Sequence, residues 1–416
     1  MSYKKLYIEF ILAWRNVWKN KRRTVLTLLT IMVGCAMVIF MKALIRGTFS
    51  HMIEDAASVN NGHIQIHEKG YWDNMGIDYA FKPTPTMIAK LASDESIQAY
   101  AQRVIAAGLA SSESDTESAM IQGVDPVQEQ NVTSLQKYVL KGGRYLKPDD
   151  REKIIIGETL AKNLGVKVGD SVSLLSQGFD GSVAAANLAV VGLFRSGNVE
   201  YDGYLIVMPI EQAKETFTMM NYITAIVIRL KDGAMMESVR SDLRRSIGSR
   251  NIEIMGWDDL MPDMVQLINI KQIQNYIFEF ILFMIVAFGV MNTIQMSVYE
   301  RIREFGIMLA IGTRPEQIRR MVQIESFYIA VLGVILGIAL GAALSMYFSI
   351  HPIDYSRFSG QIGSTFGMSV NTVPAKLEIS NILWTSIILL IVAVLFTIAP
   401  ARRASMLKPI EAIRKL

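Results

Sequence analysis

Two histidines come closest, by residue type and spacing, to a metal site. His63 and His67 lie in the alternating segment GHIQIHE, residues 62–68, a pattern typical of a β-strand. They would share one face of that strand, but four residues of extended chain separate them by about 13 Å. That distance is too long for two rings to bind one metal ion without other ligands. We therefore expect both to be structural or surface histidines.

Motifs for catalysis are absent from the sequence. It contains no Gly-x-Ser-x-Gly, His-Glu-x-x-His or paired-cysteine motif, so hydrolase and metalloenzyme functions have no support. It also lacks the Gly-x-x-x-x-Gly-Lys-Ser/Thr loop that binds nucleotide phosphates. We expect the chain not to be an enzyme, and not to hydrolyse ATP by that route on its own.

The most organised polar segment is ERIREFGIMLAIGTRPEQIRR, residues 300–320, which holds five arginines and three glutamates between two apolar stretches. The pattern predicts a helical run over 299–311 that stops at Gly312. Thr313 and Glu316 have the spacing of a capping box, and Pro315 is tolerated in a first turn. A second helix would place Ile318 on its apolar side. The sequence thus predicts a capped helical elbow; the alternative is a loop whose cations only set the membrane topology.

Four windows free of Asp, Glu, Lys and Arg flank or precede this elbow, at residues 24–41, 280–298, 326–350 and 379–401. About 20 apolar residues suffice for a helix to cross the hydrocarbon core. We predict an α-helical membrane protein with four transmembrane helices, at 24–45, 276–298, 324–350 and 379–401. Since the first window is long and lacks a small-x-small cleavage site, we expect a retained anchor and not a cleaved signal.

The cations predict the orientation. Seven precede residue 24, five lie in the 299–323 elbow and five follow Pro400, whereas the connection 351–378 has two. By the positive-inside rule, both termini and the elbow are cytoplasmic. Residues 46–275 then form one large extracytoplasmic domain, 351–378 a short loop on the same side, and 402–416 a cytoplasmic tail. The single cysteine, Cys35, lies in the first span, so the exported domain has no disulfide.

Strand and helix patterns alternate in the exported domain, which we predict to be mixed α/β. Strands are expected at 62–68, 187–194 and 251–255, a strand–helix–strand at 153–175, a strand–helix at 204–217, and a strand followed by a helix over 222–248. Helical stalks are expected to join the domain to the first and second spans.

Two further patterns concern packing at the membrane. Residues 1–23 predict an amphipathic helix in the inner interface, with Trp14 and Trp18 among its apolar residues. Gly333, Gly337 and Gly341 recur every fourth residue and line one face of the third span. Such a stripe allows another helix to approach closely. Whether it also mediates dimerisation stays open.

The segment YERIREFGIMLAIGTRPEQIRRMVQIES, together with the ending PARRASMLKPIEAIR, resembles the FtsX-like, MacB-type permeases of ABC transporters. The order of segments along the whole chain is similar too. The resemblance implies a MacB-like periplasmic domain and an elbow that contacts an ABC ATPase. Its coupling residues would be Glu300, Arg301, Arg303, Glu304, Gly306, Ala310, Gly312, Thr313, Pro315 and Ile318.

The resemblance also implies partners and a mechanism. ATP and Mg would be bound by two copies of a separate ATPase, with no cofactor in this chain, and a second permease copy or a paralogue would complete the complex in the bacterial inner membrane. The segments IQGVDPVQEQ and 153–175 are most similar to the lipoprotein-releasing LolC and LolE permeases. We therefore expect mechanotransmission that extracts lipoproteins from membrane lipid for a periplasmic carrier, with no nucleic-acid partner. Segment 176–187 corresponds to the position of a carrier-recruiting hook but lacks proline.

Three other functions remain open. The first is efflux or toxin export of the MacB type. The second is FtsX-like signalling to a cell-wall hydrolase, without transport. The third is a membrane-anchored binding domain without energy coupling.

Overall fold

The computed structural model describes residues 11–248, 251–354 and 372–408, which form two units. One unit contains the long helices and the other contains the β-sheet, and each is described by itself. The first ten residues of the predicted amphipathic helix, most of the 351–378 loop, and the tail from residue 409 lie outside the described residues.

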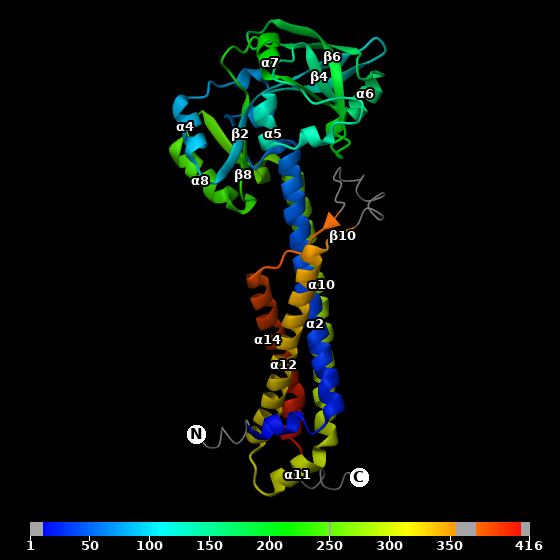
Figure 1. Cartoon of the computed structure of the whole chain (residues 1–416). Coiled ribbons are helices and arrows are strands. Elements are labelled where there is room, and N and C mark those ends of the chain that lie inside the picture. The colour runs from blue at the N-terminus through cyan, green and yellow to red at the C-terminus, as the bar shows by residue number, and fades with distance from the viewer. Residues whose placement is uncertain (1–10, 249–250, 355–371, 409–416) are drawn as a thin grey trace. The chain divides into compact units, whose positions relative to one another are not determined.

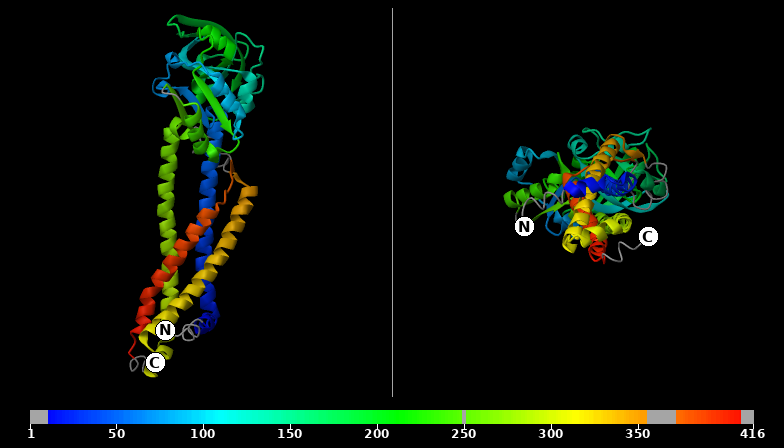
Figure 2. Two further views of the ribbon diagram at one scale, coloured as in Figure 1. Left: turned by 90° about the vertical axis from the view of Figure 1, so that its left-hand side faces the viewer. Right: turned by 90° about the horizontal axis from the view of Figure 1, so that it is seen from below.

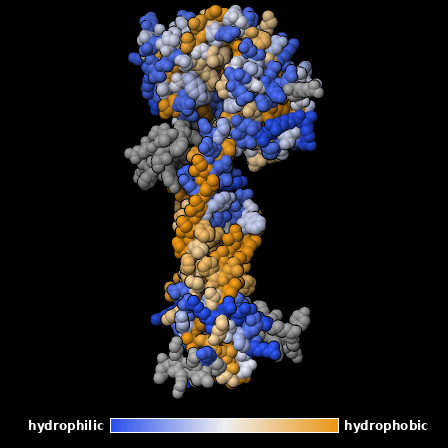
Figure 3. Space-filling view, turned by 180° about the vertical axis from the view of Figure 1, so that it is seen from behind, coloured by the Kyte–Doolittle hydropathy of each residue, from blue (hydrophilic) through white to orange (hydrophobic). Residues whose placement is uncertain are grey.

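Four helices in the described residues are long and apolar enough to cross a membrane. They are α2 (Lys21–Ala56), α10 (Pro262–Glu300), α12 (Pro315–Ile350) and α14 (Ile379–Ser405). Each contains one of the four predicted spans, and α2 and α10 extend well beyond them as the predicted stalk helices. Within their unit the four helices run side by side (Figures 1 and 2), and apolar side chains form a belt along the bundle, ending in a hydrophilic band (Figure 3).

Glycines allow the bundle helices to pack closely. A Cβ atom added to Gly333 would lie 2.7 Å from Ile31 Cβ of α2, and one added to Gly337 would lie 2.5 Å from Cys35 Cβ. On Gly341 it would lie 3.0 Å from Ile39 Cβ. The predicted glycine stripe of α12 therefore lies directly against α2 of the same chain, where any larger residue would force the helices apart.

Ion pairs also join the helices away from the elbow. Lys42 Nζ lies 2.8 Å from Glu279 Oε1 of α10, with both side chains largely buried. One turn further along α2, Arg46 Nε lies 3.4 Å from Glu378 Oε2, at the start of α14. Two neighbouring turns of α2 are thus linked to two other helices.

The second unit is built on a nine-stranded mixed sheet with the order β3-β7-β4-β6-β5-β2-β8-β1-β9. The strands are β1 (Ile64–Glu68), β2 (Ile97–Ser111), β3 (Thr116–Val124), β4 (Lys153–Gly157), β5 (Ser171–Gln177), β6 (Val183–Phe194), β7 (Leu205–Pro209), β8 (Ala225–Leu230) and β9 (Ile252–Gly256). The pairs β3–β7 and β4–β6 are parallel and the others antiparallel. Two-residue strands β10 (Ile353–Asp354) and β11 (Thr372–Val373) form a separate pair.

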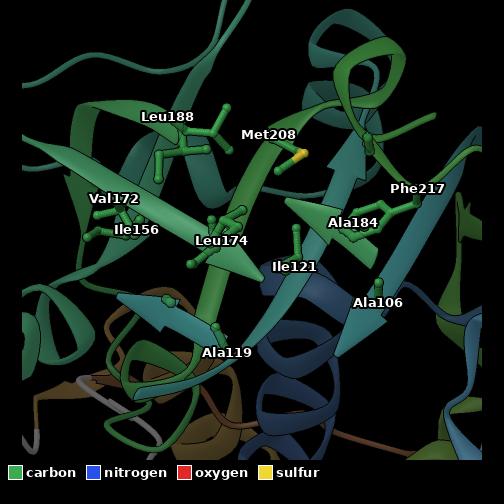
Figure 4. Close-up of a cluster of buried hydrophobic side chains, with 14 of the residues drawn as sticks. Ala106, Ala119, Ile121, Ile156, Val172, Leu174, Ala184, Leu188, Met208 and Phe217 are labelled. Carbon is green, nitrogen blue, oxygen red and sulfur yellow. The ribbon is translucent and has the colours of Figure 1, made fainter. Parts of the chain in front are cut away.

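Short helices cover this sheet and close its cores. They are α3 (Tyr71–Asn74), α4 (Pro85–Ser93), α5 (Pro126–Val132), α6 (Glu158–Leu164), α7 (Ile210–Thr216), α8 (Met236–Ser246) and α9 (Trp257–Leu260). Side chains of α6 and α7 join the largest core, in which Ile121, Ile156, Leu174 and Leu188 are fully or almost fully buried (Figure 4). Helices α4 and α8 contribute to a second core with β1 and β8. A five-residue π-helix, Ala57–Asn61, follows α2.

The predicted mixed α/β pattern is confirmed, but two strands of the nine-stranded sheet were missed. The predicted elements at 62–68, 153–175, 187–194, 204–217 and 222–255 all form, with α8 ending at Ser246 and not at Gly248. The missed strands, β2 and β3, are longer than β5 and β8, the other two strands that pair around β2. β2 is rich in alanine and lacks strict alternation; its pairing with β3, β5 and β8 stabilises it instead.

Candidate functional site

The predicted elbow forms at one end of the helical bundle. Helix α10 ends at Glu300, the chain turns at Arg301, and α11 runs over Ile302–Ala310 (Figure 1). A turn over residues 311–314 then leads into α12 at Pro315. The helical run predicted over 299–311 is thus divided at Arg301, and the connection consists of α11 and the start of α12 with a sharp break between them.

Gly312 makes this break possible. Its φ of 97° lies in the left-handed region that residues with a Cβ rarely adopt. Gly312 N donates to Leu309 O at 3.1 Å, and Thr313 N donates to Met308 O at 3.0 Å. This pair of hydrogen bonds is a Schellman motif, which satisfies the last carbonyls of α11 and fixes the direction of the chain.

The predicted capping box at Thr313 is wrong by one residue. Arg314 is the N-cap of α12, and the Gln317 side chain accepts a hydrogen bond from its backbone N at 3.1 Å. The reason is Pro315, whose ring favours an extended conformation for the preceding residue, as the Arg314 φ and ψ of −67° and 139° show. Glu316, predicted as the capping partner, instead accepts a hydrogen bond from the Arg319 side chain at 2.6 Å.

The elbow has a buried side and an exposed side. Phe305 and Gly306 of α11 and Ile318 of α12 are buried, so they fix the elbow against the bundle. On the other side, Arg303 and Ala310 are exposed. Of the remaining predicted coupling residues, Glu300, Glu304, Gly312 and Pro315 are exposed, and Arg301 and Thr313 are half-buried.

Glu325, a residue that the sequence analysis did not select, is the buried centre of an ion-pair network. Its carboxylate accepts a hydrogen bond from Arg301 Nη1 at 2.9 Å, and Arg23 Nη2 of α2 lies 3.6 Å from its Oε1. Its only signal in the sequence is an acid directly before the apolar stretch 326–350, a position that usually requires a partner. The network ties α12 to the elbow and to α2.

Two of the three elbow glutamates, Glu300 and Glu304, belong to the same network. Glu300 accepts from Arg23 Nη1 at 3.0 Å and from Asn20 Nδ2 at 3.2 Å. Glu304 accepts from Lys19, and from Arg301 Nε at 3.2 Å. The Lys19 ammonium, with the Arg301 guanidinium, holds the pKa of Glu304 below its usual value. Both glutamates therefore bind cations of their own chain.

The N-terminal segment that supplies these partners packs against the bundle. Residues 11–17 are helical, and Val17 is buried. Trp14 stacks edge-on against Tyr328 of α12, with 5.4 Å between ring centroids, while its indole and that of Trp18 remain partly exposed. The described part of the predicted amphipathic helix thus has one face on α12 and an apolar face directed outward.

The two histidines of segment 62–68 are structural. His67 is fully buried, with Nδ1 3.2 Å from Thr224 O and Nε2 2.8 Å from Gln65 Oε1. His63 is also buried, and its Nδ1 accepts from Leu230 N at 3.2 Å. In the described parts of the chain, no group of His, Cys, Asp and Glu residues could hold a metal ion.

Two family models match the chain. The MacB-like periplasmic core domain matches residues 24–246, more than half of the chain, and the FtsX-like permease C-terminal model matches residues 276–409. The chain belongs to the MacB-like, FtsX-like permease family. The second match contains the whole elbow, helices α12 and α14, and α10 from residue 276 onward.

The curated relatives include export ATP-binding/permease proteins and lipoprotein-releasing permeases. A probable syringafactin export ATP-binding/permease protein of Pseudomonas syringae pv. syringae is 23% identical over 98% of this chain and 60% of its own length. A lipoprotein-releasing system transmembrane protein LolC of Xylella fastidiosa is 25% identical over 71% of this chain and 73% of its own length. The chain spans about 60% of the length of the export ATP-binding/permease relatives.

Among solved structures, the periplasmic region of MacB from Actinobacillus actinomycetemcomitans is 16% identical, with a TM-score of 0.35, and covers 50% of this chain and 94% of its own. The family assignment depends on the two family models and not on this similarity.

Proposed function

We propose that this chain is the permease subunit of an ABC transporter, and that its elbow transmits movement from an ATPase to the extracytoplasmic domain. The observation that supports the proposal is the construction of the elbow. A loop that only set topology would need cations, but it would not need a Schellman turn, a restarted helix and a buried ion-pair network. ATP and Mg would be bound by two copies of an ABC ATPase outside these 416 residues.

The bundle offers a route for the movement. Closure of the ATPases would push the elbow, and α12 follows the elbow directly in the chain. The glycine contacts then place α12 against α2, which continues as one helix from Lys21 to Ala56. The ATPase must contact the elbow differently in its two nucleotide states, because only a differential interaction can shift a conformational equilibrium.

The proposed substrate is a lipoprotein, extracted from the outer leaflet of a bacterial inner membrane and passed to a periplasmic carrier. In this proposal both termini are cytoplasmic, the β-sheet domain is periplasmic, and a second copy or a paralogue completes the permease. The LolC relative supports it because the match covers most of both chains. Segment 176–187 is the tip of a β-hairpin: it contains the end of β5, a turn over residues 178–182 and the first residues of β6. The turn is closed by a hydrogen bond from Gly178 N to Ser182 O at 2.8 Å.

Efflux is the second candidate function. The export ATP-binding/permease relatives match 98% of this chain, a larger share than LolC does. FtsX-like signalling and a binding domain without energy coupling are further outcomes that an assay must distinguish.

The test is reconstitution of the full chain in lipid nanodiscs with the ABC ATPase encoded beside it and a fluorescent lipoprotein. We expect ATP-dependent release of the lipoprotein into solution. Stimulated ATP turnover with no release, but with efflux of an amphiphilic dye in liposomes, would favour export. No binding and no change in ATP turnover would refute the ABC function altogether.

Two glycines provide a matched pair for testing the elbow. Gly312 and Gly142 both have a φ of 97°, and a Cβ at either position would meet no atom within 4 Å. Valine at either site therefore causes similar backbone strain, of about 1–3 kcal/mol. We expect Gly312→Val to abolish the stimulation of ATP turnover and Gly142→Val, in the extracytoplasmic unit, to retain it. Equal effects of the two variants would contradict a coupling role for the elbow.

A further inference from the structure

The segment that precedes α2 has an apolar side directed away from the bundle. Residues 11–17 are helical and residues 18–20 form a turn. Ile11, Trp14 and Trp18 recur at spacings of three and four residues, and each is 42–43% exposed. Ala13 and Val17 lie on the opposite side and are fully buried. The segment thus packs on the bundle through one side and leaves much of its aromatic side exposed.

An arginine without an ion pair lies at the centre of the exposed side. Arg15 follows Ile11 by four residues and precedes Trp18 by three, so a helical arrangement places it between them. It is exposed and forms no ion pair within residues 11–248, 251–354 and 372–408. Ile11, Trp14, Arg15 and Trp18 therefore form an amphipathic surface, which we call the outward face.

A second unpaired arginine lies at the foot of the first membrane helix. Arg22, Leu26, Leu29 and Val33 are spaced by four, three and four residues, which places them in one stripe along α2. All four are exposed. Arg22 and its exposed neighbour Lys21 form no ion pair among the described residues. The stripe is thus apolar along the helix and ends in cations.

The paired cations of the same segment bind the elbow instead. Lys19 forms an ion pair with Glu304, and Arg23 forms one with Glu300 at 3.0 Å. No carboxylate in the described parts of the chain compensates the cations of the outward face and of the α2 stripe. The charge left for a partner on this side of the bundle is therefore positive.

We propose that the outward face, together with Arg22, binds an anionic phospholipid of the adjacent leaflet. The guanidinium groups of Arg15 and Arg22 bind phosphate groups at headgroup depth, since the guanidinium fork can donate two parallel hydrogen bonds to phosphate oxygens. The indole rings of Trp14 and Trp18 lie at the same depth, which is typical of tryptophan at a membrane interface. A headgroup with a net negative charge is preferred because the unpaired cations attract it, whereas a zwitterionic headgroup carries its own cation.

A lipid suits this surface better than a protein or a free phosphate ion does. The outward face adjoins the exposed apolar stripe of α2, and the apolar belt of the bundle ends in a hydrophilic band (Figure 3). Long cationic side chains at the end of a membrane helix reach into the headgroup layer. A free phosphate ion would leave the aromatic side of the segment exposed to water. A phospholipid satisfies both the cations and the apolar residues.

Native mass spectrometry of the full chain tests the site with two probes, phosphatidylglycerol and phosphatidylcholine with identical acyl chains. We expect the chain to retain phosphatidylglycerol about 10-fold more tightly. Arg15→Gln combined with Arg22→Gln should abolish that preference. Arg402→Gln combined with Arg403→Gln is the matched control, because it removes two exposed arginines from the end of α14, at the same end of the bundle (Figure 1). The control should change the preference by less than about 2-fold. Equal losses in the two double variants would show a diffuse attraction to any cation and would overturn the site.

Three further measurements separate the parts of the site and its possible occupants. Trp18→Ala should weaken the retention of both lipids and leave the preference unchanged, because the indole ring contacts the interface without selecting a charge. Millimolar inorganic phosphate should not displace phosphatidylglycerol; displacement would show that the site binds phosphate alone. Release of the bound lipid on addition of the ABC ATPase encoded beside the chain would show that a protein covers the outward face. Either of these last two results would overturn the lipid assignment.

Lipid binding should also stabilise the elbow, because the same segment binds Glu300 and Glu304 through Arg23 and Lys19. We expect the α11 amides to exchange hydrogen about 3-fold more slowly in nanodiscs of phosphatidylglycerol than in nanodiscs of phosphatidylcholine. Arg15→Gln combined with Arg22→Gln should remove this difference. Equal exchange rates of the unmodified chain in the two lipids would overturn the effect on the elbow. Neither the retention of the two lipids nor the exchange measurement requires the ATPase, so both are independent of the proposed function.

Discussion

The contact between α12 and α2 allows a quantitative prediction for Gly337→Val. A Cβ at this position would lie 2.5 Å from Cys35 Cβ and 3.0 Å from Met32 O. Ordinary carbon–carbon contacts are about 3.5–4.0 Å, so the helices must separate by about 1 Å. The neighbouring contacts cannot absorb this shift, because a Cβ on Gly333 or on Gly341 would also lie no more than 3.0 Å from α2 atoms.

The expected cost follows from that separation. A gap of 0.5–1 Å removes about a quarter to a half of the dispersion energy of each contact across the interface. Inserting carbons into a packed core typically costs about 1–3 kcal/mol. Since three successive glycine contacts lie on the same helix face, we expect Gly337→Val to lower the free energy of unfolding by about 3 kcal/mol, the upper end of that range.

The assay is reversible unfolding of the full chain in mixed micelles by an increasing fraction of sodium dodecyl sulfate, followed by helical circular dichroism. Ala343→Leu is the control, because Ala343 is an exposed residue of the same helix, and we expect it to change stability by less than about 0.5 kcal/mol. Cys35→Gly combined with Gly337→Val should recover part of the loss, because it removes the Cβ that the introduced valine would meet. Equal stabilities of Gly337→Val and Ala343→Leu would refute the packing argument.

Three further predictions concern buried charges. Glu129→Ala should destabilise the extracytoplasmic domain by about 3–5 kcal/mol in chemical denaturation, because it leaves Arg103 buried and unpaired. Glu325→Ala should speed hydrogen exchange of the α11 amides at least about 10-fold, since it removes the buried centre of the elbow network. The Arg144 guanidinium holds the pKa of Asp150 well below its usual range. The ion pair therefore contributes its full stabilisation to the folded domain above about pH 4, and this contribution is lost as the pH falls further. Asp150→Asn should therefore lower stability at pH 7 and flatten the acid side of the stability profile measured by thermal unfolding.

The membrane helices and the elbow break were predictable from local sequence. An uncharged window of sufficient length is the physical requirement for a span. Glycine adopts the left-handed conformation more readily than any other residue, and Gly312 has that conformation after α11. The cap of α12 was misplaced because Pro315 restricts Arg314, an effect that outweighed the preference of threonine for N-caps.

Strands β2 and β3 were not predictable in the same way. The β2 sequence IQAYAQRVIAAGLAS has few β-branched residues and shows no clear alternation. Its 15 residues are held by pairing with three strands, one of which, β8, lies more than 110 residues later in the chain. Pairing between strands that are far apart in the chain leaves almost no signal in a short stretch of sequence.

The elbow network shows why residue type alone did not reveal the roles of the charged residues. Lys19 and Glu304 are separated by 285 residues in sequence, so the chain gave no sign that they form a pair. An exposed glutamate in a proposed coupling segment invites the interpretation that it contacts the partner, yet Glu304 binds Lys19 and Arg301 of its own chain and so acts as a positioning residue. Both interpretations predict loss of coupling when Glu304 is replaced. They differ in the step that fails. Replacing a contact residue lowers the affinity for the ATPase, whereas replacing a positioning residue lowers the transmission that follows binding. Only separate measurement of affinity and maximal turnover can assign the residue.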